Sequence, residues 1–303
     1  MSECLVTTLK GAITDSSLLR LGELKIKVTP TTLYNIGLTT QNPVTASIVS
    51  DGYFTDSTGT ANLGKTATTQ GNVETHFYLN PGEYDIVFSN KYDFMQVGFA
   101  RGTYNIMSND LSDYTGCKNM FLLYNSGDNV TGNLKKFVDN VSPDFTHLYL
   151  NHTKVDGTLA DLSQFTQMIT LSLSGSTIRG NISALSVMRN LRFLNADNTS
   201  IEGDISSLST TMLKTLSISS SSGNSAITGN ISSLTGLTDM EFLNLGRTAV
   251  SGNLSSLASL TKLTSLNLNS TNVVGDTSDL ASLTLLTTFT YTNTAITGTW
   301  PLT

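Results

Sequence analysis

The sequence predicts a mainly β protein, in which a small N-terminal β-sandwich precedes a solenoid with a parallel β-sheet and few helices. Three observations predict this class: a glycine that recurs at a nearly fixed spacing, apolar residues at constant distances from that glycine, and short alternating runs separated by turn residues in the first hundred positions. A fixed period of this length indicates a repeat architecture, and short alternating runs with turns between them are typical of a sandwich.

Residues 1–20 are expected to form an N-terminal arm, and residues 21–108 the β-sandwich. Alternation of apolar and polar residues begins at 23–28. It returns in five further runs, which are 33–38, 44–49, 74–79, 84–88 and 94–99. Turn sequences such as Asn42-Pro43 and Asn80-Pro81-Gly82 separate the runs. Strands of this length and spacing favour an all-β domain with two packed sheets.

The solenoid is expected to span residues 109–303 in about eight coils, one for each recurring glycine. The glycines are separated by 25, 23, 23, 26, 23, 23 and 23 residues. They are Gly132, Gly157, Gly180, Gly203, Gly229, Gly252, Gly275 and Gly298. Apolar residues recur nine and seven positions before the glycine and two and five positions after it, as in Leu243, Leu245, Leu254 and Leu257 around Gly252. Solenoids present extended surfaces to partners, so binding or assembly is favoured over catalysis.

These columns resemble the leucine-rich repeat, LxxLxLxxNxL, over almost two thirds of the chain. The segments GNIS, GDIS and GNLS resemble the variety with 23–24 residues per repeat. The resemblance implies a parallel β-sheet on a concave face, and short strands, turns or 3₁₀ segments on a convex face. Trp300, two residues after the last glycine, is expected to cover the end of the solenoid, unless another subunit covers it.

The family carries asparagine four residues before the glycine, where its amide bonds backbone groups of adjacent turns. Here the column begins with Asp128 and continues with hydroxyl residues, which we expect to form a structural ladder in place of the asparagine ladder. A hydroxyl has one donor and two acceptor lone pairs, enough to satisfy some buried backbone groups. The ladder residues are Thr153, Ser176, Thr199, Ser225, Thr248, Thr271 and Thr294.

Two irregular spacings mark insertions. Three extra residues before Gly229 fall in 219–224 and are expected to bulge where a concave strand ends, while two extra residues before Gly157 fall around 141–144 on the convex side. Insertions in repeat proteins often mark a contact face, and a neutral polar bulge is the alternative at both places.

The outward residues of the concave strands, which alternate with the core leucines, form the candidate binding face. Most are Ser, Thr or Asn, with a few aromatic residues among them. Aromatic side chains suit protein interfaces, and an aromatic platform beside Asn and Asp suits sugars. The candidates are His147, Tyr149, Phe193, Asn195, Asp197, Phe242, Asn244 and Asn267.

Composition and missing motifs argue against several classes of function. The formal charge is −6 with 13% charged residues and no basic cluster, which argues against nucleic acid as a partner. No run approaches the ~20 apolar residues of a membrane span. Cys4 and Cys117 are expected to be two thiols, with a disulfide between them as the alternative, and there is no CxxC or Cys/His cluster to hold a metal. Without GxSxG, HExxH, P-loop or GxGxxG elements, we expect no cofactor and no enzymatic activity.

The beginning of the chain carries a second resemblance. CLVTTLKG, followed by an aspartate and then LGELKIKV, resembles the opening of virion structural proteins from bacteriophages of gut Bacteroidales, including the crAss-like group. The resemblance covers about thirty residues. It implies an N-terminal segment that docks on a capsid or tail and a distal domain that projects outward.

The function expected from both resemblances is that of a non-enzymatic virion protein: a head fibre, capsid decoration protein or tail adhesin. Its partners would be other virion proteins through the N-terminal region, and a bacterial surface glycan or protein through the repeats. A homo-oligomer, dimer or trimer, is expected, because fibres use cyclic symmetry. The alternative is a bacterial cell-surface or secreted leucine-rich-repeat protein that binds host protein or glycan.

Overall fold

The computed structural model describes the chain in segments. Backbone is described for 8–13, 22–28, 34–39, 44–49, 54–56, 65–67, 73–79, 82–88, 94–101, 110–111, 122–124, 130–221 and 226–300. Side chains are described at Asp110, Leu111 and Leu123 and throughout the last two ranges. The chain divides into two compact units, Met1–Asp156 and Gly157–Thr303, and each is considered separately.

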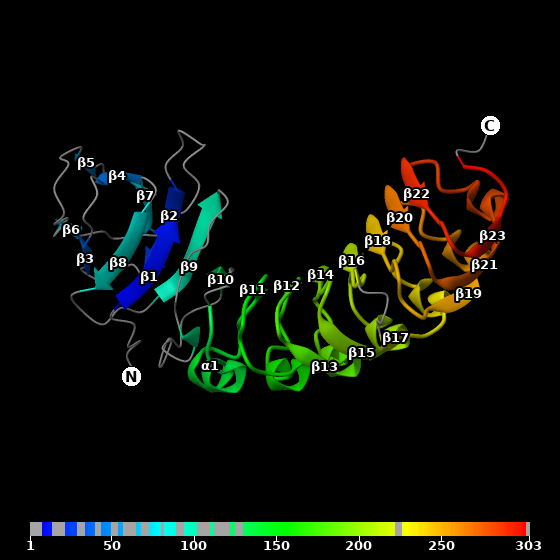
Figure 1. Ribbon diagram of the computed structural model, residues 1–303, viewed down its shortest axis with the longest axis horizontal. Coiled ribbons are helices and arrows are strands. Elements are labelled where there is room, and N and C mark those ends of the chain that lie inside the picture. The colour runs from blue at the N-terminus through cyan, green and yellow to red at the C-terminus, as the bar shows by residue number, and fades with distance from the viewer. Residues whose placement is uncertain are drawn as a thin grey trace. The chain divides into compact units, whose positions relative to one another are not determined.

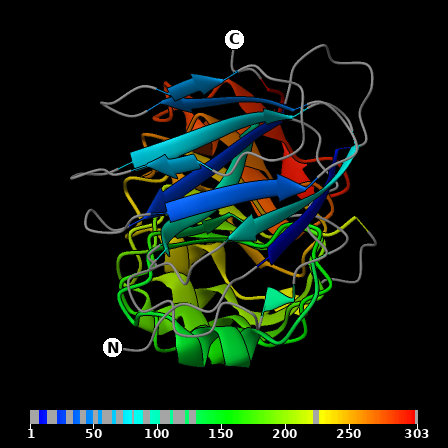
Figure 2. The ribbon, with the colours of Figure 1, turned by 90° about the vertical axis from the view of Figure 1, so that its left-hand side faces the viewer.

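The first unit begins with antiparallel strands, whose blue and cyan arrows face the viewer in Figure 2. One sheet has the order β1-β8-β3-β6, and the antiparallel strands of a second sheet have the order β9-β2-β7-β4-β5. The strands are β1 (Thr8–Ile13), β2 (Gly22–Val28), β3 (Tyr34–Thr39), β4 (Val44–Val49), β5 (Phe54–Asp56), β6 (Lys65–Ala67), β7 (Val73–Leu79), β8 (Gly82–Phe88) and β9 (Phe94–Arg101). The six predicted runs correspond to β2, β3, β4, β7, β8 and β9. The face-to-face packing that defines a sandwich stays a prediction.

Strand β1 lies inside the segment predicted as an arm. It pairs with β8 over its whole length, from Thr8 opposite Val87 to Ile13 opposite Gly82. Its sequence, TLKGAI, carries a glycine that weakens the strand signal. Part of the predicted arm is therefore a strand of the first sheet.

The first unit ends with parallel strands and the one α-helix of the described residues. Strand β10 (Leu122–Tyr124) lies between β9 and β11 (His147–Tyr149). Helix α1 (Leu134–Asn140) is capped by Asn133, whose side chain accepts a hydrogen bond from the Lys136 amide at 2.9 Å. The insertion at 141–144 directly follows α1, so the two extra residues belong to a coil that contains an α-helix.

The second unit has a row of short parallel strands, which Figure 1 shows in chain order. Adjacent strands pair in register, so that Leu171, Leu194, Leu216, Leu243, Leu266 and Phe289 form one buried line. The strands are β12 (Thr170–Ser172), β14 (Phe193–Asn195), β16 (Thr215–Ser217), β18 (Phe242–Asn244), β20 (Ser265–Asn267) and β22 (Thr288–Thr290).

The opposite side of the unit carries 3₁₀ helices, which contribute buried Ile and Leu side chains to the core. They are η2 (Leu159–Leu162), η3 (Ile182–Val187), η4 (Ile205–Leu208), η5 (Ile231–Leu234), η6 (Leu254–Leu257) and η7 (Thr277–Leu280). The predicted solenoid, with a parallel sheet and few helices, is confirmed.

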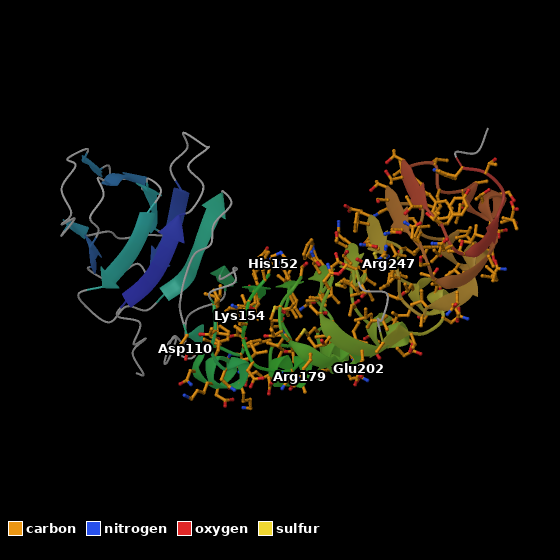
Figure 3. All side chains as sticks on the ribbon, viewed as in Figure 1. Asp110, His152, Lys154, Arg179, Glu202 and Arg247 are labelled. Carbon is orange, nitrogen blue, oxygen red and sulfur yellow. The ribbon has the colours of Figure 1, made fainter. Side chains whose placement is uncertain are left out.

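Short strands that lie before the 3₁₀ helices in the chain form two three-stranded parallel sheets. One contains β13 (Arg179–Asn181), β15 (Ser200–Asp204) and β17 (Ala226–Thr228), and the other β19 (Ser251–Asn253), β21 (Asn272–Asp276) and β23 (Ala295–Thr297). Figure 3 labels Arg179 and Glu202 on this side of the unit.

The residue after the recurring glycine caps the 3₁₀ helix. Its side-chain oxygen accepts a hydrogen bond from the amide two residues later, at 2.8–3.0 Å, which satisfies a donor that the helix leaves free. The caps are Asn181, Asp204, Asn230, Asn253 and Asp276. This cap explains the N/D and S of the GNIS-type segments.

The glycine itself lies against the cap of the preceding coil. Gly252 has a φ of 120°, and a Cβ built on it would collide with the side-chain oxygen of Asn230. A Cβ on Gly203 would stand 2.6 Å from the side-chain oxygen of Asn181 in the same way. Glycine is therefore needed at this position for two reasons: its backbone has a conformation that L-residues avoid, and the neighbouring coil leaves no space for a Cβ.

Aromatic side chains pack on Phe289 of β22. Trp300 is half-buried and meets the buried Phe289 ring edge-on, with centroids 5.7 Å apart. Tyr291 stacks on the same ring at 4.6 Å. These contacts agree with the predicted role of Trp300 as a cover for the core.

Candidate functional site: the strand face of the second unit

We use the term strand face for the outward residues of β12, β14, β16, β18, β20 and β22, together with the residue two positions after the end of each strand. They form three rows, because side chains alternate along each strand and the strands are in register. The first row is Thr170, Phe193, Thr215, Phe242, Ser265 and Thr288. The second row is Ser172, Asn195, Ser217, Asn244, Asn267 and Thr290. The third row is Ser174, Asp197, Ser219, Gly246, Asn269 and Thr292.

The second row is a chain of hydrogen bonds between coils. The Asn244 amide nitrogen donates to the Ser217 and Ser219 hydroxyls at 3.0 and 3.1 Å. Its oxygen accepts from Asn267 Nδ2 at 2.8 Å and from the Gly246 amide at 3.2 Å. An asparagine side chain has two donors and two acceptor lone pairs. The polar capacity of Asn244 is therefore filled by its own protein.

Asp197 is satisfied in the same way. One carboxylate oxygen accepts from the Ser217 hydroxyl at 2.6 Å, and the other accepts from the Ser219 amide and hydroxyl at 2.6 and 2.7 Å. Asn267 has both lone pairs of its oxygen filled, by the Asn269 amide at 3.0 Å and the Thr290 hydroxyl at 2.9 Å. Three predicted binding residues, Asp197, Asn244 and Asn267, thus join neighbouring coils.

The predicted hydroxyl ladder has a different geometry from the asparagine ladder that it was expected to replace. Its threonine hydroxyls donate to the carbonyl three residues earlier in their own coil, at 2.6–2.9 Å, and the bonds between coils lie on the strand face instead. The donors are Thr153, Thr199, Thr248, Thr271 and Thr294. Ser176 Oγ is buried and makes no hydrogen bond. Ser225 lies outside the described residues, as does Asp128.

A left-handed residue precedes each of these threonines, as Gly175 precedes Ser176. The five residues have φ between 54° and 58°, a conformation that turns the chain back on itself. They are His152, Asn198, Arg247, Ser270 and Asn293. Sequence reasoning did not identify these positions. The mixture of residue types gives little signal beyond the enrichment of Asn in left-handed positions.

The first row carries the aromatic residues of the second unit's strand face. Phe193 and Phe242 stand on either side of Thr215, one strand apart from it in each direction. Phe242 exposes 37% of its surface, and Phe193 is half-buried. Asn195, the remaining predicted residue here, accepts a hydrogen bond from the Asp197 amide at 3.1 Å.

Two predicted residues, His147 and Tyr149, belong to β11 of the first unit. The His147 ring is half-buried, with Nδ1 2.7 Å from the Thr146 hydroxyl. Burial lowers the pKa of His147 from its ordinary value, because the charged imidazolium loses solvation. The neutral ring is therefore favoured at neutral pH.

Hydrogen bonds fix the first residues of the insertion that starts at Ser219. The Ser221 amide donates to the Asn198 side chain at 2.6 Å, and the Ser220 amide to the Gly246 carbonyl at 3.2 Å. The Arg247 guanidinium, labelled in Figure 3, donates to the Ser221 carbonyl. Residues 222–225 lie outside the described part of the chain, so the predicted bulge stays a prediction.

The described residues contain neither a candidate membrane span nor a candidate metal site. None of their helices is long and apolar enough to cross a membrane. Their His, Cys, Asp and Glu side chains form no group of three that could hold a metal ion. Cys4 and Cys117 lie outside the described residues.

Comparison with known proteins identifies the fold through solved structures. No protein-family model matches the sequence, and no curated protein sequence matches it. The plant peptide hormone receptor RGFR1, in complex with RGF2, matches with a TM-score of 0.52 and 22% identity over 61% of this chain and 30% of that one. The leucine-rich-repeat ectodomain of the Arabidopsis thaliana receptor kinase GASSHO1/SCHENGEN3 matches with a TM-score of 0.50 and 21% identity, over 61% of this chain and 22% of that one.

The matched region spans less than a third of either receptor chain. At this identity the likeness concerns the fold. It agrees with the parallel register of the strand face, the 3₁₀ helices opposite it and the 23-residue period. The repeats of this chain have the leucine-rich-repeat fold.

Proposed function

We propose that this chain is a non-enzymatic binding protein, and that the strand face of its second unit is the binding surface. The observation that carries the proposal is the register of the strands, which sets outward side chains in three regular rows on a surface fixed by hydrogen bonds between coils. A rigid surface loses little conformational entropy when a partner binds. Solenoids of stacked repeats use extended surfaces of this kind.

The finer proposal is that the protein is part of a bacteriophage virion, as a head fibre, capsid decoration protein or tail adhesin. Its support is the N-terminal sequence CLVTTLKG and LGELKIKV, together with a surface that owes its polarity to Ser, Thr and Asn rather than to charge. The N-terminal region would dock on other virion proteins. The strand face would remain free for a partner on the bacterial surface.

The virion proposal is tested by quantitative mass spectrometry of purified particles of the phage that encodes the chain. We expect its peptides at a fixed ratio to those of the major capsid protein through successive density gradients. Washing with salt or detergent should leave that ratio unchanged. Peptides found in outer-membrane or culture-supernatant fractions of uninfected cells, and missing from particles, would contradict the proposal.

The binding surface is tested separately by blocking it. Asn267→Trp places a large side chain on the strand face, whereas Ser255→Trp places one on a 3₁₀ helix of the opposite side. The labelled full-length protein should bind bacterial cells of the host strain. Asn267→Trp should abolish this binding and Ser255→Trp should leave it intact. The reverse pattern would move the binding surface to the other side of the solenoid.

A further inference from the structure

We infer that the strand face binds an extended acidic peptide segment, one aromatic side chain of which inserts between Phe193 and Phe242. This inference rests on the proposed binding function and specifies its partner. The site, which we call the phenyl notch, consists of Phe193, Thr215 and Phe242. Arg192, which directly precedes β14, and Arg189, three residues earlier in the chain, supply its positive charge.

The dimensions of the phenyl notch suit one aromatic ring. Phe193 and Phe242 lie on strands separated by one intervening strand, so their backbones are about 10 Å apart at ~4.8 Å per strand. A ring placed midway would lie ~5 Å from each phenyl group. That distance falls within the range of about 4.5–7 Å that is favourable for aromatic pairs. Thr215 is the residue between them and is small enough to leave the space open.

Charge at the edge of the notch favours an acidic partner. Backbone hydrogen bonds at 2.8 Å, from the Lys214 amide to the Arg192 carbonyl and from the Glu241 amide to the Lys214 carbonyl, place these three residues side by side. Lys214 forms an ion pair with Glu241 at 3.1 Å. Arg192 also interacts electrostatically with Asp239, whose ion-pair partner is Lys262. Among the described residues, neither Arg189 nor Arg192 forms an ion pair within 4 Å. The edge therefore has two exposed guanidinium groups available for a carboxylate.

The filled polar rows favour a peptide over a saccharide. A sugar is held by many hydrogen bonds from its hydroxyls, and it would need free amides and carboxylates next to the aromatic rings. Here Asp197, Asn244 and Asn267 already bond their own neighbours. A peptide needs fewer hydrogen-bond partners on the strand face, because an aromatic anchor and a carboxylate supply most of its contacts.

An apolar side chain near the notch extends it. The Met212 amide donates to the Leu191 carbonyl at 3.1 Å, which places Met212 next to the coil of Arg192. Met212 exposes 53% of its surface. Methionine side chains adapt to varied apolar partners. A second apolar residue of the peptide would contact Met212.

The experiment selects ligands without presupposing their sequence. The full-length protein is immobilised, and a library of random linear peptides displayed on messenger RNA is enriched on it. The enriched peptides should share an aromatic residue with Asp or Glu within two positions. Their affinity is then measured by fluorescence polarisation.

Variants locate the binding. Phe242→Ser and Thr215→Trp should each weaken the enriched peptides about tenfold or more, by removing one wall or filling the space. Arg192→Gln should weaken them about threefold to tenfold and reduce the dependence on salt. Two matched controls, Leu285→Ser and Arg179→Gln, remove an exposed apolar residue and, from β13 outside the strand face, a cation of the same unit. They should change affinity by less than about twofold.

Three outcomes would overturn the inference. Enrichment of peptides without the aromatic and acidic pair, or no enrichment at all, rejects the peptide class. Peptides blocked by Asn267→Trp but indifferent to Phe242→Ser and Thr215→Trp reject the notch while leaving the strand face as the binding surface. Peptides indifferent to all of these variants reject the proposed binding surface as well. An acidic oligosaccharide that binds, and loses affinity in Phe242→Ser, would replace the peptide as the ligand.

Discussion

Two buried hydroxyls at equivalent positions of different coils have opposite hydrogen bonding. Thr248 Oγ1 donates to the Leu245 carbonyl at 2.6 Å, whereas Ser176 Oγ makes no hydrogen bond. A buried hydroxyl without a partner has lost its water and gained nothing in return. The two positions therefore offer a matched comparison of what a hydroxyl contributes in this column.

We predict that Thr248→Val lowers the free energy of unfolding by about 1–2 kcal/mol, because the shape is kept and a buried hydrogen bond is lost. Ser176→Ala should change it by less than about 0.5 kcal/mol or raise it, since no bond is lost. Urea denaturation followed by circular dichroism measures both. Equal losses at the two positions would remove the hydrogen bond as the cause.

The carboxyl group of Asp276 makes the stability of the fold depend on pH. Hydrogen bonds from the Thr297 hydroxyl, and from the Ser278 hydroxyl and amide, hold the pKa of Asp276 at about 2, below its ordinary 3.8. A carboxyl whose pKa is lower in the folded state stabilises the fold above its unfolded value. That contribution is lost as the pH falls from about 4 through about 2.

The pH prediction compares the parent with Asp276→Asn. The parent should have the higher denaturation midpoint at pH 6, and the difference between the two should shrink between pH 4 and pH 2. The coil with a neutral cap supplies the control: Asn253→Ala should destabilise to the same extent at all of these pH values. A parent–Asp276→Asn difference that stays constant down to pH 2 would contradict the role of the charged cap.

At the scale of the element, the unit of packing is a cap and a glycine from two different coils. Asn230 caps η5 by accepting from the Ser232 amide at 2.9 Å, and its side chain occupies the space where a Cβ on Gly252 would lie. We predict that Gly252→Ala costs at least about 2 kcal/mol, from the strained φ and the displaced cap. Gly236, which has no heavy atom within 4 Å of an added Cβ, is the control. Gly236→Ala should be neutral or slightly stabilising.

A double-mutant cycle separates the two causes of the Gly252 penalty. Asn230→Ala should cost about 1 kcal/mol alone, as the loss of a helix cap does. In that background Gly252→Ala should cost less than it does in the parent, because the side chain that it collides with is gone. Strict additivity would mean that backbone strain alone explains the glycine.

The elements differ in how far their sequence reveals them. The leucines around Gly252 predict a strand and a buried turn directly, because their spacing repeats in every coil. The capping role of Asn230 is local too, and the GNIS segment contains it, yet the asparagine was not interpreted as a cap. The role of Asp197 was beyond sequence reasoning, because its partners Ser217 and Ser219 lie 20 and 22 residues away, and only the register of the coils brings them together.

The first coil shows a similar limit. Two extra residues around 141–144 predicted an irregularity on the convex side, but not that helix α1 would precede them. Phe137 and Phe145, buried with their rings 5.6 Å apart and edge-on, lie on either side of this segment. The repeat pattern does not report the volume of the core side chains, so it does not distinguish a coil with an α-helix from a coil with a 3₁₀ helix.

At the scale of the whole molecule, the solenoid of the second unit should tolerate a change in the number of coils. Each coil contacts its neighbours through the same register, so its stability is close to a sum of coil and interface contributions. We predict that a tandem copy of Asn230–Gly252 folds with one more strand in the sheet. The unfolding midpoint should be no lower than that of the parent. Circular dichroism and urea denaturation measure both quantities.

The control for that experiment duplicates one residue fewer, 231–252. This insertion removes the cap from the added coil and shifts every later side chain by one position. It should therefore unfold at a clearly lower urea concentration than the parent. Equal stability of the two insertions would show that the cap and glycine do not set the register.

The contact between a cap and the glycine of the following coil also bears on how such a gene changes length. A copying slip of one full period keeps each asparagine or aspartate cap at its usual distance along the chain from the next recurring glycine, so the lengthened protein inherits the packing of its parent at once. A slip of another length separates these partners in at least one coil. Selection would then remove most such products, and the spacing of 23 residues found between five of the seven pairs of successive glycines is what would remain.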